Sequence, residues 1–427
     1  LQRSPDVWER WKSVATPDSH PMLTVVDGPI AEWEKVDSAS DALHVRPHHT
    51  KPPAATGVYL AQGAVVPAAT EATRSGPEHT STPMKYDAIL LSSFGGPEGQ
   101  EDVLPFLRNV TRGRGIPDER LEEVAHHYRQ FGGISPINDQ NRKLKAALQD
   151  ALSEVGLDMP IYWGNRNWSP YLDEALSQAA EDGVRKMIAI PTSAYSSYSS
   201  CRQYREDWAD ALEATGLQQT LQIDKVRQFF SHPGFIQPFI DGLRTGVDDA
   251  RRAGHDSSQI EVLFSTHSIP TADAARSGAG VFADVQGGGY VGQHLAVARE
   301  VIAQAAPEIS WQLVYQSRSG PPSQPWLEPD INDALKALQG RTAVLIVPLG
   351  FVSDHMEVLW DLDEEASTTA ADLGLWVTRT PTPGTHPDFV RGLVDLVQER
   401  VIGRPVGKRA NATSAGAWLD VCRAGCC

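Results

Sequence analysis

Residues 84–97 read MKYDAILLSSFGGP, an apolar run that ends in a glycine turn. A buried strand that leads directly into glycines is typical of the first strand of an α/β sheet. More apolar runs follow, and amphipathic segments such as 140–155 and 233–254 separate them. The predicted strands are 88–91, 161–163, 187–191, 221–226, 262–265, 311–315, 343–348 and 375–378.

The alternation of strands and helices predicts an α/β fold with parallel strands, because a helix between two strands returns the chain to the same end of the sheet. The strands divide four and four about a boundary near 229–238. We therefore expect two Rossmann-like halves, each a four-stranded parallel sheet flanked by helices, with the active-site cleft between them. A single eight-stranded barrel is the alternative, and the long and uneven connections argue against it.

The chain before residue 84 differs from the rest. Residues 1–83 are rich in Pro, Ser, Thr, Ala and His and show no sustained periodicity, which predicts a low-complexity, disordered extension. A mis-set translation start is the alternative, and we favour it. The expected domains are then 84–235 and 236–402 for the two halves, and 403–427 for a tail that carries cysteines.

Composition argues against several classes of protein. The 427 residues carry 38 Lys+Arg against 54 Asp+Glu, a net charge of −16, which disfavours nucleic-acid partners and acidic membrane surfaces. No apolar run approaches the roughly 18 residues of a membrane span, and the opening LQRSPDVWER has no secretory pattern. The sequence also lacks phosphate-loop, nucleophile-elbow and zinc-protease motifs. We expect a cytoplasmic protein with no nucleic acid and no integral membrane contact.

Polar and glycine-rich segments follow the predicted strands. Ligands of open α/β sheets collect at the carboxyl ends of the strands. The segments are SSFGGP at 92–97, GNRNW at 164–168, SAYSSYSSCRQY at 193–204, STHSIP at 265–270, QSRSGPP at 316–322 and GFVSDHMEVLWDLDEE at 350–365. Both halves contribute to this set, so the predicted site is the cleft between them.

Two of these segments contain a candidate base and candidate metal ligands. His267 follows a buried strand, where a neutral imidazole can accept a proton or bind a metal; a structural strand-end histidine is the alternative. Glu357, Asp361 and Glu365 are spaced by four residues, which predicts one face of a helix with successive carboxylates about 6 Å apart. Such carboxylates repel each other, and a divalent cation would relieve the repulsion; a solvated acidic face is the alternative.

A third group of candidates is cationic and aromatic. Arg108, Arg112 and Arg114 cluster in FLRNVTRGRGIP, and arginine binds carboxylate and phosphate groups through paired hydrogen bonds; a solvated helix end is the alternative. Aromatic residues from the strand ends are candidates for an apolar wall, with core packing as the alternative for each: Phe94, Tyr195, Tyr198 and Tyr204.

Five segments together point to one family. They are NVTRGRG at 109–115, FGGISPIN at 131–138, STHSIP at 265–270, QSRSGPPSQPWLEPD at 316–330 and GFVSDHMEVLWDLD at 350–363. In this order they resemble the ferrochelatases, and in particular the coproporphyrin ferrochelatases of Gram-positive, actinobacterial type. The resemblance covers 84 to about 402, and 1–83 show none.

The resemblance implies a chelatase-type fold of two Rossmann-like halves and a lyase of haem (porphyrin) biosynthesis that inserts Fe²⁺ into a porphyrin. By their match to family positions, His267 and Glu357 are expected to be catalytic, binding the metal and taking up the pyrrole protons. Asp361 and Glu365 match an acidic, metal-binding path that delivers Fe²⁺ to the ring.

The resemblance also implies substrate-binding residues. Ser135 and Tyr204 match positions that contact the carboxylates of the porphyrin. Arg112 and Arg114 lie in the substrate-binding segment, and Phe94 and Tyr198 are further candidates. Two positions depart from the family pattern: Thr111 stands where one arginine is expected, and Phe94 stands where some members carry a tyrosine that ligates the product iron.

Coproporphyrin III is the substrate that the resemblance implies. Its four propionates, against two in protoporphyrin IX, account better for an arginine cluster in a protein of net charge −16. The alternatives are a protoporphyrin IX ferrochelatase, a chelatase that loads cobalt or another metal into a different tetrapyrrole, and a tetrapyrrole carrier or sensor without turnover. The expected partner is a downstream enzyme that processes coprohaem.

The four cysteines are Cys201, which follows a predicted strand, and Cys422, Cys426 and Cys427 at the end of the sequence. Four thiolates are the ligand count of a [2Fe–2S] cluster. The resemblance implies such a cluster, with one internal and three C-terminal ligands and a structural role for the tail. Incidental thiols and a zinc site are the alternatives.

Overall fold

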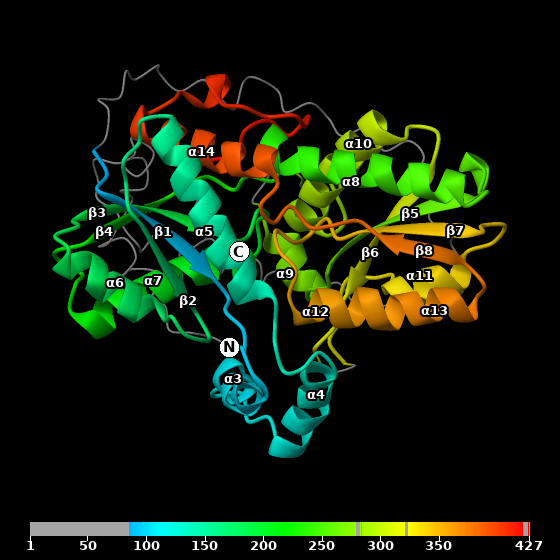
Figure 1. Ribbon diagram of the computed structural model, residues 1–427, viewed down its shortest axis with the longest axis horizontal. Coiled ribbons are helices and arrows are strands. Elements are labelled where there is room, and N and C mark those ends of the chain that lie inside the picture. Colours follow the sequence, from blue (N-terminus) through cyan, green and yellow to red (C-terminus); the bar gives the residue numbers. More distant parts are fainter. Residues whose placement is uncertain (1–84, 279–281, 283, 321–322, 422–425, 427) are drawn as a thin grey trace, which may run out of the picture. The chain divides into compact units, whose positions relative to one another are not determined.

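The structure is a computed structural model that describes residues 85–278, 282, 284–320, 323–421 and 426, so the predicted extension at 1–83 lies outside it. Within these residues, eight strands form two four-stranded sheets, and every pair of neighbouring strands is parallel (Figure 1). The first sheet has the order β2 (Ile161–Asn165), β1 (Ala88–Ser93), β3 (Lys186–Pro191) and β4 (Gln222–Lys225). The second has the order β6 (Ser310–Gln316), β5 (Ile260–His267), β7 (Ala343–Val347) and β8 (Trp376–Arg379).

The two sheets confirm the predicted α/β fold and show that the barrel alternative is wrong. In each half, the strand that comes first in sequence lies second in the sheet, so both halves have the same topology. β1 and β7 are buried at every residue. Helices cover both faces of each sheet, so side chains on both faces of these strands are buried. The strand sequences are therefore largely continuous apolar runs rather than alternating patterns.

In the first half, α6 (Leu172–Glu181) and α7 (Gln203–Thr215) pack on one face. The other face carries α5 (Ile137–Glu154) and α14 (Pro387–Val401). In the second half, α8 (Pro233–Arg252) and α10 (Gly288–Ala305) cover one face, and α11 (Ile331–Ala337) and α13 (Ser367–Asp372) cover the other. Among the described residues, no helix is both long and apolar enough to cross a membrane.

The remaining helical segments lie in the connections. They are α3 (Val103–Val110), α4 (Asp118–Gln130), α9 (Thr271–Arg276) and α12 (Met356–Val358), the 3₁₀ turns Gln100–Asp102, Ser257–Gln259 and Val406–Lys408, and two π-helices, Tyr198–Arg202 and Leu359–Ala366. The acidic segment is helical, as predicted, but Leu359–Ala366 at its centre is a π-helix rather than an α-helix. A spacing of four residues fits either helix type, so the pattern of carboxylates could not distinguish them. Leu362 and Ala366 of the π-helix are buried against the second sheet.

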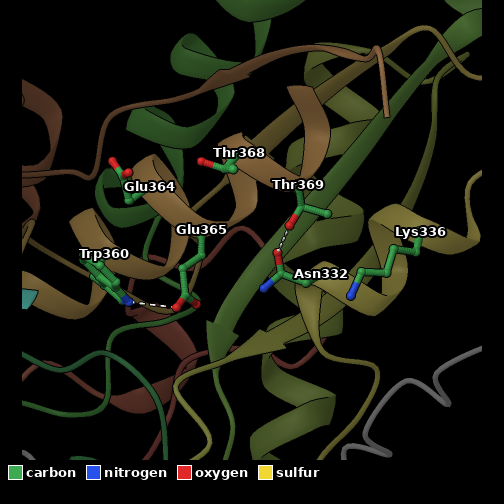
Figure 2. A pocket seen from close by; sticks show the side chains of 7 residues that line it. All are labelled: Asn332, Lys336, Trp360, Glu364, Glu365, Thr368 and Thr369. Carbon is green, nitrogen blue, oxygen red and sulfur yellow. Dashed lines mark hydrogen bonds between the residues drawn. The ribbon is translucent and has the colours of Figure 1, made fainter. Parts of the chain in front are cut away.

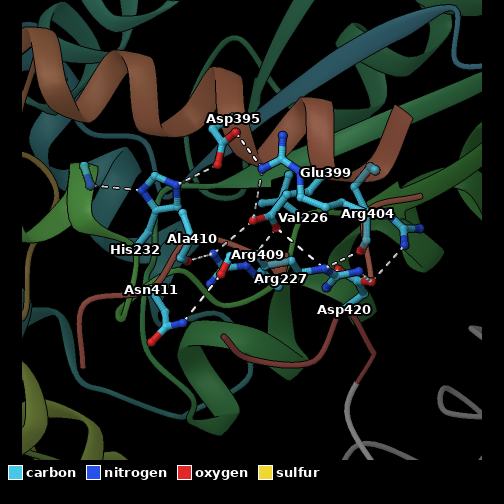
Figure 3. A network of polar contacts seen from close by, with 12 residues as sticks. Val226, Arg227, His232, Asp395, Glu399, Arg404, Arg409, Ala410, Asn411 and Asp420 are labelled. Carbon is cyan, nitrogen blue, oxygen red and sulfur yellow. Dashed lines mark hydrogen bonds and ion pairs between the residues drawn. The ribbon is translucent and has the colours of Figure 1, made fainter. Parts of the chain in front are cut away.

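α14 connects the two halves, because it packs on α8 of the second half and on α5 and β3 of the first. A buried ion-pair network surrounds it (Figure 3). Arg227 Nε donates to Glu399 Oε2 at 2.8 Å, and both side chains are almost fully buried. Within the tail beyond α14, Arg409 forms a two-pronged pair with Asp420 at 2.8 and 2.7 Å. Arg400 of α14 lies 3.2 Å from the same Asp420 carboxylate, and this ion pair fastens the tail to the helix.

Candidate active site

His267 is the last residue of β5, at the carboxyl edge of the second sheet. Its Nδ1–H donates to the carbonyl oxygen of Ser268, and since a carbonyl can only accept, the neutral ring carries its proton on Nδ1. Nε2 keeps its lone pair and lies 3.6 Å from Glu357 Oε2. Burial by itself lowers the pKa of His267, but the Glu357 carboxylate outweighs it and raises that pKa above the usual value. The imidazole is thus a base directed at the acidic segment.

Glu357 lies between two imidazole rings. His355 Nδ1 is 4.0 Å from the same carboxylate oxygen that faces His267. Burial alone would raise the pKa of Glu357, but the two histidines hold it at about 2. His355 was not among the predicted site residues, although the motif at 350–363 contains it two positions before Glu357. A metal ion at this point would meet one carboxylate and two imidazoles, which is a donor set that suits divalent iron.

Two residues at the end of β6 form hydrogen bonds to the acidic segment that contains Glu357 and Asp361. Gln316 Nε2 donates to the Glu357 carbonyl oxygen at 3.0 Å, and the Ser317 hydroxyl donates to Asp361 Oδ2. Ser317 has a φ of +61°, a left-handed conformation that non-glycine residues adopt rarely and that tends to occur at functional sites. Neither Gln316 nor Ser317 was predicted as a site residue. Their place after a strand, in QSRSGPP, was the available signal.

Asp361 lies one turn beyond Glu357 and differs from it electrostatically. Burial raises the pKa of Asp361, and repulsion by Glu357 adds to the increase, which brings the pKa to about 7. A carboxyl group with that pKa exchanges its proton near neutral pH. It can therefore bind a cation and release it again without a large change in conditions.

Glu365 lies at the outer end of the acidic row, next to a surface pocket of about 440 Å³. Figure 2 shows Trp360 Nε1 donating to Glu365 Oε1, at 2.8 Å, beside this pocket. The lining residues are Asn332, Lys336, Trp360, Glu364, Glu365, Thr368 and Thr369. The row Glu357, Asp361, Glu365 thus runs from His267 to a surface pocket, and its role in delivering a metal stays a prediction.

α4 packs against the same acidic segment. The His127 ring stacks on Trp360 with 3.9 Å between centroids and 5° between planes. Tyr128 is buried in a cluster with Phe106 and Met356, and the pKa of its phenol rises far above the usual value because of burial and the nearby Glu357. α4 therefore connects the arginine-bearing loop before it to the metal-binding candidates.

Arg112 and Arg114 are exposed in the loop between α3 and α4. Their neighbours Gly113 and Gly115 have φ values of +77° and +65°, and only glycine adopts such values readily. Arg108 instead pairs with Asp118 at 2.8 Å on the surface. The loop thus presents two guanidinium groups to solvent, as a site for an anionic ligand requires.

The other predicted substrate contacts are less accessible. Phe94 follows β1 and is 37% exposed, whereas Ser135 and Tyr204 are 4% and 5% exposed. The Tyr204 ring lies under the Arg166 guanidinium at 4.6 Å. The Tyr198 hydroxyl donates to Glu206 Oε2 at 2.8 Å. The roles of these residues toward a substrate stay predictions.

Two of the four predicted cluster ligands fall within the described residues. Cys201 lies in the π-helix Tyr198–Arg202 and is 2% exposed, and Cys426 is 8% exposed. Cys422 and Cys427 lie outside the described residues.

Comparison with known proteins gives a consistent result. A family model described as "Ferrochelatase" matches residues 86–401. The chain is 60% identical over 370 residues to a coproporphyrin III ferrochelatase of Leifsonia xyli subsp. xyli, with 84% of this chain and 95% of that protein covered. Proteins of the same name from Tropheryma whipplei and Streptomyces griseus subsp. griseus are 55% identical over 347 residues (80% and 89% covered) and 52% identical over 361 residues (81% and 94% covered).

Proposed function

Because the chain belongs to the ferrochelatase family, we propose that it is a coproporphyrin ferrochelatase, a lyase that inserts Fe²⁺ into coproporphyrin III to give Fe-coproporphyrin III, or coprohaem, in haem biosynthesis. Insertion replaces the two pyrrole N–H protons by one Fe²⁺ ion, so two protons leave the ring for each ion that enters. The reaction therefore needs a base beside the ring nitrogens and ligands that hold the cation until the ring accepts it.

His267 supplies the base. Its Nε2 lone pair faces the site, and its raised pKa makes the imidazole a better proton acceptor than a free histidine. Glu357, 3.6 Å away, stabilises the imidazolium that forms. After each insertion the protons pass to solvent, and the neutral ring is restored.

The row Glu365, Asp361, Glu357 delivers the Fe²⁺ ion to the ring. Fe²⁺ binds first near Glu365 at the pocket, and Asp361 and Glu357 take it inward. Because the pKa of Asp361 is about 7, this carboxyl group gains negative charge when a cation approaches and loses it when the cation leaves. Asp361 is therefore charged while the cation is beside it and takes up a proton once the cation has left, which limits the repulsion within the empty row.

Arg112 and Arg114, in the loop between α3 and α4, attract the anionic porphyrin. Arg112 and Arg114 are exposed guanidinium groups in a chain of net charge −16, and they suit the propionates of coproporphyrin III. Phe94 offers an exposed apolar surface at the end of β1 for the face of the macrocycle.

The observation that carries the proposal is the position of Glu357 between His267 and His355, at 3.6 and 4.0 Å, at the head of the acidic row. The test is an anaerobic assay of the purified protein with Fe²⁺ and either coproporphyrin III or protoporphyrin IX, followed by the loss of free-porphyrin fluorescence. We expect loss with coproporphyrin III and at least about 10-fold slower loss with protoporphyrin IX, the size of effect that differential contacts to two extra carboxylates can produce.

Other outcomes would assign other functions. Faster turnover of protoporphyrin IX would identify that porphyrin as the substrate, and turnover with Co²⁺ alone would identify a cobalt chelatase. Binding of the porphyrin without loss of fluorescence in either assay would indicate a carrier. The downstream coprohaem-processing partner and the cytoplasmic location stay predictions.

We also propose a [2Fe–2S] cluster held by Cys201, Cys422, Cys426 and Cys427. The burial of Cys201 and Cys426 fits a group that is shielded from solvent. When bound, such a cluster would cross-link the tail to the first half. Protein prepared without oxygen should show iron–sulfur absorbance that disappears in Cys201→Ser. Colourless wild-type protein with no bound sulfide would contradict the cluster.

A further inference from the structure

Arg379 closes β8 and lies beside the end of β7, where the chain turns toward the acidic segment. Its side chain is 14% exposed. Nε and Nη2 donate to the two carboxylate oxygens of Asp363, at 2.5 and 2.9 Å. Nη1 donates to Asp354 Oδ1 at 3.1 Å. One guanidinium group therefore donates hydrogen bonds to two carboxylates, using Nε and Nη2 for Asp363 and Nη1 for Asp354.

The two carboxylates bracket the metal-binding candidates in sequence. Asp354 directly precedes His355 and lies three positions before Glu357, and Asp363 lies two positions after Asp361. Asp354 is held further by Thr382 Oγ1 at 3.1 Å. Its N–H donates to Gln140 Oε1 of the first half at 2.9 Å. The start of the acidic segment is thus fixed to both halves, and Arg379 ties the π-helix to that fixed point.

Arg379 also neutralises part of the negative charge of the acidic segment, through its ion pairs with Asp354 and Asp363. Burial by itself lowers the pKa of Arg379, but its two carboxylate partners raise it, so the guanidinium stays charged. Asp363 is only two positions from Asp361 in the sequence, and the structure pairs it with Arg379. The two carboxylates compensate the positive charge of the Arg379 guanidinium, so this charge adds no net repulsion toward an approaching Fe²⁺ ion.

A π-helix of this length calls for such contacts, because π-helical structure is rare and occurs mostly as single turns inside α-helices. Gln316 and Ser317 form hydrogen bonds to Glu357 and Asp361. Arg379 forms an ion pair with Asp363, two positions further along the π-helix. Together these contacts fix the rotation of the helix about its axis, and that rotation decides whether the row of carboxylates faces His267.

We infer that Arg379 is a positioning residue for metal delivery: by clamping Asp354 and Asp363 it orients Glu357 and Asp361 toward His267. The inference rests on the proposed function, since it concerns the same acidic row. Arg379 acts through these two carboxylates and contacts neither the porphyrin nor the metal. Its loss should therefore weaken the handling of Fe²⁺ and leave porphyrin binding intact.

The test compares three full-length variants with the wild type. Arg379→Gln removes the clamp, Arg379→Lys keeps the charge but not the two-pronged geometry, and Asp363→Asn removes only the helix-side partner. Arg341→Gln is the matched control, because Arg341 pairs with Glu261 at 3.0 Å near the amino ends of β5 and β7, whereas Arg379 lies at the carboxyl end of β8. Steady-state kinetics give KM separately for Fe²⁺ and coproporphyrin III, and Co²⁺ titration of the porphyrin-free protein, followed by its visible absorption, gives metal affinity without turnover.

We expect Arg379→Gln to raise KM for Fe²⁺ and weaken Co²⁺ binding by about 10- to 100-fold, the usual effect of losing a partner that orients metal ligands, with KM for coproporphyrin III changed by less than about two-fold. Arg379→Lys should be intermediate, and Asp363→Asn should change the same constants in the same direction even if Arg379→Gln does not fold. Arg341→Gln should lower only the melting temperature.

Two results would overturn the inference while leaving the proposed function intact: unchanged KM for Fe²⁺ in folded Arg379→Gln or Asp363→Asn, or equal changes in both KM values and in the Arg341→Gln control. A wild-type protein that inserts no iron would instead refute the proposed function, and the Co²⁺ titration would still report whether Arg379 orients the metal ligands.

Discussion

Glu357 illustrates how much a single residue depends on its surroundings. Burial by itself would raise the pKa of Glu357, yet His267 and His355 hold that pKa at about 2. Four positions later, Asp361 has a pKa of about 7. Two carboxylates with pKa values driven apart are suited to different tasks: Glu357 remains an anion beside the base, and Asp361 changes charge as the cation passes.

The first prediction concerns this pair. His267→Ala and Glu357→Gln should each lower the rate of iron insertion by at least about 100-fold, because one removes the base and the other removes the carboxylate that stabilises its protonated form. The measurement is the loss of coproporphyrin III fluorescence under anaerobic conditions, with circular dichroism to show that the fold persists. His255→Ala, at a histidine that bonds Thr342 away from the site, is the control. Near-normal turnover in either site variant would refute the assignment.

Sequence patterns predicted His267 and Glu357 as site residues but not the residues that contact them. His355 contacts Glu357 within the same segment, two positions away. Gln316 and Ser317, at the end of β6, contact Glu357 and Asp361 in the segment that follows β7. A motif shows that polar residues follow a strand. It does not show which of them meet, because that depends on the order of the strands in the sheet.

Among the elements, the π-helix Leu359–Ala366 and α4 are coupled. The row of apolar residues in the π-helix is buried on the second sheet, while Trp360 faces outward and is covered by His127 of α4. α4 buries Leu121, Ala125 and Tyr128 in a cluster with α3 and Met356. The stack adds an aromatic contact that joins α4 to the π-helix itself.

The second prediction follows from this attachment. Trp360→Ala should increase the hydrogen-exchange rate of the α4 amides by about five-fold, because an aromatic pair contributes about 1 kcal/mol. Trp360→Phe keeps a ring against His127 and loses only the hydrogen bond to Glu365, so its α4 amides should exchange at nearly the wild-type rate. The amides of α5 serve as the internal reference. Equal protection of α4 in both variants and the wild type would contradict the role of the stack.

At the level of the whole molecule, buried polar groups join the two halves. The His294 ring of the second half stacks on Tyr195 of the first at 3.6 Å, and the Tyr195 hydroxyl donates to the Leu349 carbonyl oxygen at 3.0 Å. His294 Nδ1–H donates to the Tyr290 carbonyl oxygen, and Nε2 accepts from Thr266 Oγ1. Both ring nitrogens are thus satisfied by a neutral imidazole.

The third prediction is a pH dependence of stability. Burial lowers the pKa of His294 to about 3, against 6.5 in an unfolded chain. Between those values the unfolded chain binds a proton that the folded protein excludes, so the contribution of His294 to stability is complete above pH 6.5 and is lost as the pH falls. From pH 7 to pH 5 this loss amounts to about 2 kcal/mol.

The variant His294→Gln removes the titrating group. Urea unfolding at pH 7 and pH 5 should therefore show a free energy of unfolding that falls by about 2 kcal/mol less in the variant than in the wild type. The variant will be less stable at pH 7 because the stack with Tyr195 is altered, but only the difference between the two pH values matters. An equal loss in both proteins would show that His294 does not carry this dependence.

The sequence by itself determined the eight strands and the two matched halves, because hydrophobic periodicity reports directly on backbone geometry. It also placed His267 and Glu357 after strands of one half, and strand ends converge by topology. Only the tertiary structure decided the π-helix and the partners of its charges. Asp363 meets Arg379, 16 positions away, and Arg227 meets Glu399, 172 positions away. Such pairings arise when the sheets bring distant segments together, and the energy of a charge depends on that neighbourhood rather than on the local sequence.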